Sequence, residues 1–247
     1  MRHSSEANRK PLSKSGPPES KAGSDPEKLR WNGSLKKPLA LGGSGGAGAS
    51  STAPSSPQTG KEQKTSALGP GLRLSKWPGH EVHPGVFVGD LSCALDLAQL
   101  RQRKITHVLT ATNRMKPMFP AEIHYLVLDF PDAADQNLLD ALAEAHTFIA
   151  EAHAAGGAVL IHCMAGQSRS VSVALSYIMK REGVSDTEAL AALRAHRSDA
   201  KPIAAFQEQL ALFHRMQYRV DDAHPEVQRL RRSTSKIPVI RSKPPEP

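Results

Sequence analysis

The amino-acid sequence predicts a three-layer α/β domain in which helices flank one central, mostly parallel sheet. Two observations predict this class. Across residues 79–222, short apolar runs of strand length alternate with longer helical patterns, which is typical of strand–helix–strand units. One run, residues 158–163 (AVLIHC), begins with four consecutive apolar residues, as expected of a parallel strand that is covered on both faces.

Each element follows from its local pattern. Two glycines end a long segment of helical apolar periodicity at residue 157, and Gly183 ends the next one. In SDTE, which begins at Ser185, Ser and Glu have the spacing of a capping box at a helix start. The predicted strands cover residues 85–90, 106–111, 124–130 and 158–163. The predicted helices cover residues 95–104, 137–157 and 168–182, a segment that begins after Ser185, and residues 203–217.

Composition and charge separate this domain from its flanks. Residues 1–78 are rich in Ser, Gly, Pro and Lys and carry thirteen basic against five acidic residues, a net charge of +8. Such a segment buries too little apolar surface to offset the entropy of ordering, so we expect a disordered basic tail. Residues 79–222 carry thirteen basic and seventeen acidic residues, a net charge of −4. Residues 223–247 carry six basic and two acidic residues, a net charge of +4, and we expect them to form a second basic tail.

The basic tails have two interpretations. A solvated arm is favoured, because no run reaches five consecutive basic residues. The alternative is weak, non-specific contact with nucleic acid or an anionic surface through counterion release.

Cellular context is suggested by what the sequence lacks. No stretch approaches the roughly 18 apolar residues of a membrane span, and the basic, Ser-rich beginning has no apolar core of a secretory signal. The two cysteines, Cys93 and Cys163, do not provide a disulfide framework or a zinc site. We therefore expect a reducing compartment, the cytoplasm or the nucleus.

The stretch HCMAGQSRS, residues 162–170, carries the strongest chemical signal. Its loop follows a buried strand and precedes a helix, so it is expected at the carboxyl end of the sheet, where α/β proteins bind ligands. The N–H groups of a tightly curved loop and of the first helical turn form an anion site, and a glycine permits the curvature. The residues predicted to hold a dianion are Met164, Ala165, Gly166, Gln167 and Ser168.

Cys163 begins this loop and Arg169 ends it. Loop amides, the helix N-terminus and the guanidinium all favour negative charge, so we expect Cys163 to be a thiolate at neutral pH. The planar guanidinium binds two phosphoryl oxygens together, which a lysine does less well. Ser170 is expected to donate a hydrogen bond to the departing thiolate. His162 is expected to orient the loop, since an ionised thiolate needs no base.

Transfer of a phosphoryl group to sulfur also needs a proton for the leaving oxygen. Three aspartates lie in LDFPDAADQN, residues 128–137. Asp129 ends a predicted strand, and Asp135 precedes a helix, where an acid often serves as a cap. Asp132 lies in the middle of the loop, and the residues alone give it only a modest lead as the general acid.

These residues resemble the signature of the cysteine-dependent protein phosphatases, which reads His-Cys, five residues, Arg, then Ser or Thr. The form Ala-Gly-x-Ser-Arg-Ser is similar to the dual-specificity branch, and HPGVFVGD, ITHVLTAT and FQEQLALF extend the resemblance over nearly the whole folded part. Asp132 lies 31 residues before Cys163, the spacing of this family's acid, so the resemblance assigns Asp132 that role.

The stretch FHRMQYRVDD, residues 213–222, resembles the end of the catalytic domain in the atypical subgroup that continues into a zinc-binding tail. No cysteine follows Cys163 in this sequence, so we expect that zinc module to be absent here.

The resemblance implies a phosphoric monoester hydrolase, without metal or cofactor, that acts on phosphoserine, phosphothreonine and phosphotyrosine in proteins through a phosphocysteine. We expect a monomer. Cys163 would attack phosphorus, Arg169 would bind the phosphoryl group, Asp132 would serve as acid and then base, and Ser170 would assist the leaving thiolate. One alternative is a non-protein substrate such as RNA, a glucan or a phosphoinositide, of which the neutral Met164 and Gln167 disfavour only the polyanionic lipid. Another is a phosphate-binding scaffold without turnover.

Two further residues have structural interpretations. Cys93 is expected to be a core residue at a helix start, with protection of oxidised Cys163 as the alternative. Trp77 is expected to pin the linker against the domain.

Overall fold

The computed structural model describes residues 77–242 of the 247-residue chain. Apart from Trp77 and Pro78, the predicted N-terminal tail lies outside the described residues. The strands are β1 (His80–His83), β2 (Val86–Gly89), β3 (Ile105–Ala111), β4 (His124–Leu128), β5 (Gln136–Asn137), β6 (Ala158–His162), β7 (Ser235–Lys236) and β8 (Val239–Arg241). The helices are α1 (Leu91–Ala94), α2 (Leu97–Gln102), α3 (Leu139–Ala154), α4 (Arg169–Glu182), α5 (Asp186–His196), α6 (Ala204–Arg215) and α7 (Pro225–Ser233).

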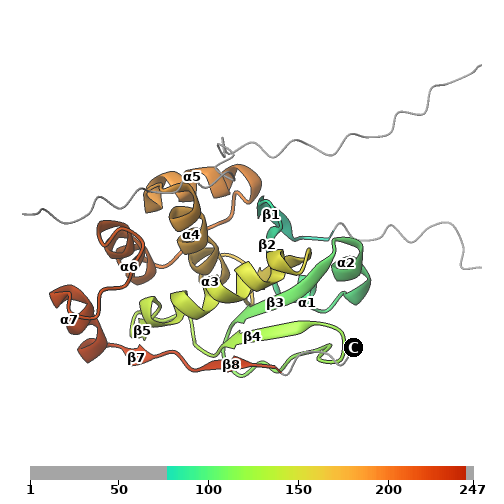
Figure 1. The fold of residues 1–247 in the computed structure, drawn as a ribbon, viewed down its shortest axis with the longest axis horizontal. Helices are drawn as coiled ribbons and strands as arrows, with labels where there is room; N and C mark the ends of the chain where they lie inside the picture. Colours follow the sequence, from blue (N-terminus) through green and yellow to red (C-terminus); the bar gives the residue numbers. More distant parts are fainter. Residues whose placement is uncertain (1–76, 243–247) are drawn as a thin grey trace, which may run out of the picture. The chain divides into compact units, whose positions relative to one another are not determined.

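The central sheet has six strands in the order β1-β2-β6-β3-β4-β8, and β5 and β7 form a separate pair (Figure 1). The four inner strands, β2, β6, β3 and β4, run parallel to one another, and the two edge strands are antiparallel to their neighbours. This arrangement confirms the predicted mostly parallel sheet. His162 at the end of β6 pairs with Gly89 and Thr110, so the loop that follows leaves from the carboxyl edge of the sheet.

Alternate residues of each inner strand face two different helical layers, as the pleat of a strand requires. Leu109 and Ile161 belong to the core beneath α3, α4, α5 and α6, whereas Val108 and Leu160 belong to the smaller core beneath α1 and α2. The predicted three layers are therefore present. Among residues 77–242, no helix combines the length and the apolar character needed to cross a lipid bilayer.

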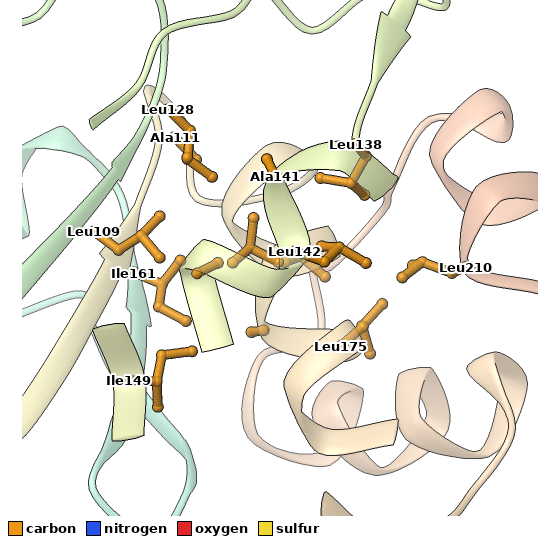
Figure 2. Close-up of a cluster of buried hydrophobic side chains, with 14 of the residues drawn as sticks. Leu109, Ala111, Leu128, Leu138, Ala141, Leu142, Ile149, Ile161, Leu175 and Leu210 are labelled. Atoms are coloured by element: carbon orange, nitrogen blue, oxygen red, sulfur yellow. The ribbon is translucent and has the colours of Figure 1, made fainter. Parts of the chain in front are cut away.

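The larger core fixes the helix that follows the loop. Figure 2 shows Leu142 of α3 and Leu175 of α4 between Ile161 of the sheet and Leu210 of α6. These side chains are buried, and burial of each contributes about 1.5–3 kcal/mol relative to leaving it exposed. The N-terminus of α4 is thereby held rigidly beside the end of β6.

Several local predictions are confirmed. Ser185 and Glu188 form the reciprocal capping box at the start of α5, and Gly183 ends α4 in the left-handed conformation with φ of 69°. Trp77 is buried and donates its indole N–H to the Cys93 carbonyl. Cys93 is itself buried at the start of α1, and burial raises the pKa of its thiol to about 12, which favours the core interpretation.

The structure differs from the expected basic tail after residue 222, because residues 225–241 fold onto the domain as α7, β7 and β8. Pro225 occupies the first turn of α7, where its missing N–H removes no hydrogen bond. Val227 and Ile237 are buried in the larger core. The segment also pairs through its backbone with β4 and β5, and such pairing leaves little trace in the sequence.

Candidate active site

Cys163 lies at the carboxyl end of β6, and its sulfur is surrounded by hydrogen-bond donors. The Gly166 N–H donates to Cys163 Sγ at 3.2 Å, and Ser170 Oγ lies 3.2 Å from the same sulfur. The Gly166 N–H is therefore a donor to this sulfur, and the Ser170 hydroxyl lies within donating distance of it. The structure thus brings together the predicted nucleophile and the predicted leaving-group donor.

The loop after Cys163 is shaped from behind by Arg197, which the sequence analysis missed. Arg197 is buried and donates to the carbonyls of Gly166 at 2.7 Å and Ala165 at 3.2 Å. Gly166 has φ of 70°, and a Cβ there would lie 2.7 Å from the Gly89 carbonyl oxygen, so glycine is required. Since these carbonyls face Arg197, we infer that the loop amides face the cleft and form the anion site.

Arg169 contributes a buried, partly unpaired guanidinium at the start of α4. Its NH1 group donates to Thr112 Oγ1 at 2.9 Å and to the Phe130 carbonyl at 3.1 Å, which fixes the plane of the fork. Its Nε is buried and has no hydrogen-bond partner among the described residues. A buried donor of this kind is costly unless a ligand oxygen accepts from it.

The three aspartates after β4 have different partners. The Ser168 hydroxyl donates to Asp132 Oδ1 at 2.7 Å, which joins Asp132 directly to the loop of residues 163–169, which we call the phosphate loop. The Asp129 carboxylate instead accepts the Arg114 backbone N–H, and the Asp135 carboxylate accepts from the side chain of its neighbour. Of the three carboxylates, only that of Asp132 has a hydrogen bond to the phosphate loop.

His162 is buried beneath the loop and is bonded on both ring nitrogens. Nε2 lies 2.9 Å from Thr110 Oγ1, and Nδ1 lies 3.4 Å from the Cys163 carbonyl oxygen. Burial lowers the pKa of His162 to about 4, so the ring is neutral at neutral pH. This environment suits the orienting role expected from the sequence.

The site opens into a cleft of about 520 Å³. The predicted residues that line it are Asp132, Cys163, Met164, Ala165, Gln167, Ser168 and Arg169. His162, Gly166 and Ser170 are not among the lining residues, although each is bonded to Cys163.

The rest of the lining comes from the segment before α6 and from α6 itself, which the sequence analysis did not assign to the site. These lining residues are Lys201, Pro202, Ile203, Ala204 and Gln207. Backbone N–H groups of Lys201 and Ile203 donate to the Gln167 carbonyl and to Ser168 Oγ, at 2.8 and 3.1 Å. No local pattern in the sequence indicates these long-range contacts.

Comparison with known proteins identifies the family. The profile of the family described as "Dual specificity phosphatase, catalytic domain" matches residues 86–216, a range that includes every residue lining the cleft. This chain belongs to the dual-specificity phosphatase family. It is 35% identical over 133 residues to dual specificity protein phosphatase 1B of Arabidopsis thaliana, covering 54% of this chain and 80% of that protein.

Two further comparisons agree with that assignment. Human dual specificity protein phosphatase 22 is 37% identical over 134 residues, covering 54% of this chain and 72% of that protein. The structure of human tyrosine phosphatase-like serine/threonine/tyrosine-interacting protein matches with a TM-score of 0.55 and 31% identity, covering 57% of this chain and 98% of that one. The chain is therefore a protein phosphatase that hydrolyses phosphoric monoesters.

Proposed function

We propose that this phosphatase hydrolyses phosphoserine, phosphothreonine and phosphotyrosine in proteins through a phosphocysteine intermediate. The observation that carries the proposal is the buried Arg169 Nε, which has no hydrogen-bond partner among the described residues and belongs to a side chain that lines the same cleft as Cys163 and Asp132. A phosphoryl oxygen supplies the acceptor that this nitrogen lacks.

In the first step the phosphoryl group binds to the loop amides and to Arg169. Cys163 attacks phosphorus as a thiolate, a P–S bond forms, and the bond from phosphorus to the leaving oxygen breaks. Asp132, acting as a carboxylic acid, gives its proton to that oxygen. The fixed dipoles of the loop stabilise charge on the three remaining phosphoryl oxygens.

In the second step the intermediate is hydrolysed. The Asp132 carboxylate accepts a proton from water, whose oxygen attacks phosphorus while the P–S bond breaks. Ser170, 3.2 Å from the sulfur, donates a hydrogen bond to the departing thiolate. Phosphate then leaves, and the starting protonation states are restored.

The charge of the cleft walls favours a protein substrate over a long polyanion. The lining is short of positive charge: besides Arg169 it contains Lys201, while Met164 is half exposed and apolar. A long polyanion such as RNA would favour more basic walls. An extended peptide needs only the phosphate site and a moderately polar rim.

Asp132→Asn is expected to separate substrates by leaving group. Turnover of a phosphotyrosine peptide and of a phosphoserine peptide should fall by roughly 10²- to 10³-fold, because each leaving oxygen needs a proton. Hydrolysis of 2,4-dinitrophenyl phosphate, whose leaving group needs none, should be largely retained. Steady-state kcat for the three substrates is the measurement.

Asp135→Asn is the matched control and should leave all three rates close to those of the unmodified protein. An equal loss in Asp135→Asn would show that the acid is the wrong aspartate. If the unmodified protein hydrolysed neither the phosphotyrosine peptide nor the phosphoserine peptide, the proposed substrate class would be contradicted.

A further inference from the structure

The C-terminal segment packs against the loop that carries Asp132, yet it lies outside residues 86–216, the range that matches the family. We call residues 225–242, which comprise α7, β7 and β8, the C-terminal strap. Figure 1 shows the strap passing from α7 through β7 to β8, which lies alongside β4. We call residues 129–135, between β4 and β5, the acid loop.

The strap bonds to both ends of the acid loop through main-chain groups. At the first end, the Asp129 N–H donates to the Pro238 carbonyl at 3.0 Å. At the other end, the Ser235 N–H donates to the Asp135 carbonyl at 2.6 Å, and the parallel pairing of β7 with β5 continues from that bond. In the sequence, Asp132 lies midway between Asp129 and Asp135, the two residues that make these contacts.

The strap is itself anchored independently of the acid loop. Ile237 and Val227 are buried in the larger core. Arg231 donates twice to the Asp140 carboxylate on the first turn of α3, at 2.7 and 2.9 Å. At the far end, Arg241 pairs with two glutamates of α3 and β8 pairs with β4. The strap is therefore a fixed body against which the loop is held.

Side-chain packing does little to hold the middle of the acid loop. Phe130 is buried, but Pro131, Asp132, Ala134 and Asp135 are exposed. Ala134 borders an open groove of about 570 Å³ between α6 and α7 rather than a packed core. Main-chain hydrogen bonds to the strap therefore hold the two ends of a loop whose middle has little side-chain packing.

We propose that the C-terminal strap is a positioning element for the general acid, holding Asp132 at the proton-transfer distance from the leaving oxygen. This inference rests on the proposed role of Asp132. A short loop that is fixed at both ends has few conformations. Less conformational entropy is therefore lost when the acid adopts the reactive geometry. The single hydrogen bond from Ser168 then suffices to direct the carboxyl into the cleft.

Ser235→Pro tests the proposal by removing the N–H that bonds to Asp135, and Ser235→Ala is the matched control that keeps this N–H. In Ser235→Pro we expect kcat for the phosphoserine peptide to fall by about 10- to 100-fold, the cost of a small misplacement of a catalytic group. Hydrolysis of 2,4-dinitrophenyl phosphate should change little, and Ser235→Ala should behave as the unmodified protein.

A strap that only stabilises the fold would lower both rates together, and that result, or no loss in Ser235→Pro, would overturn the proposal. The double variant Asp132→Asn/Ser235→Pro should be no slower than Asp132→Asn alone, because the strap acts through Asp132. An additive loss in the double variant would also overturn it.

Failure of the strap proposal is distinguishable from failure of the proposed function. If Asp132→Asn leaves the dependence on leaving group unchanged, the assignment of the acid fails first. If Ser235→Pro does not fold, as judged by its thermal transition, Arg231→Ala takes its place and Arg232→Ala becomes the control. Arg231→Ala must then show a selective loss on the peptide that Arg232→Ala lacks; equal rates in the two variants would reject the proposal.

Discussion

Cys163→Ser is expected to abolish turnover of every phosphate ester while the protein still folds and binds phosphate. A serine hydroxyl is not ionised at neutral pH, and the hydrogen-bond donors around Cys163 Sγ do not make it a nucleophile. The loss in kcat should be on the order of 10⁴-fold or more, as for removal of a nucleophile elsewhere. The measurement is kcat for p-nitrophenyl phosphate, with the thermal transition as the check on folding.

Cys93→Ser is the control for that variant, because the chain contains only these two cysteines. Cys93 is buried at the start of α1 and is not among the residues that line the cleft, so its replacement should leave turnover in place. Comparable rates in Cys163→Ser and the unmodified protein would remove the nucleophile from the mechanism.

Arg169→Lys is expected to cost about 10³-fold in kcat/KM, although the charge is kept. The guanidinium holds Thr112 and the Phe130 carbonyl with one nitrogen and leaves Nε for the phosphoryl group. An ammonium group is a point charge without this planar fork, and it cannot make the structural and the catalytic bonds together. Binding of orthovanadate should weaken in parallel with the loss of turnover.

The same exchange at Arg181, in the last turn of the same helix, supplies the control and should leave kcat/KM unchanged. If kcat/KM fell no further in Arg169→Lys than in Arg181→Lys, a positive charge alone would be enough for phosphate binding and the bidentate geometry of the guanidinium would be unnecessary.

The part of the site that could be predicted is contiguous in the sequence. Cys163 and Arg169 belong to one loop between a strand and a helix, so their proximity follows from local structure alone. The choice of Asp132 as the general acid needed further information, because the residues alone gave it only a modest lead over the two other aspartates of the loop. The family resemblance then assigned the role to Asp132. Its hydrogen bond to Ser168 is the structural observation that sets it apart.

The parts that the sequence did not predict depend on contacts between distant segments. Arg197 reaches the carbonyl of Gly166 from the end of α5, and nothing around Arg197 in the sequence indicates that partner. The same is true of the strap, whose pairing with β4 and β5 is made by backbone atoms. Only Val227 and Ile237 in that segment are buried apolar residues, too few to create a periodic pattern.

Site-resolved alkylation tests the central proposal, that Cys163 is the reactive nucleophile of the site. The protein is treated with iodoacetamide at pH 6, with and without orthovanadate, and the two cysteines are separated by peptide mass spectrometry. We expect Cys163 to be modified much faster than a free thiol and to be protected by orthovanadate, while Cys93, whose pKa is raised to about 12, stays unmodified. Alkylation of Cys163 no faster than that of free thiol, or without protection, would contradict the account.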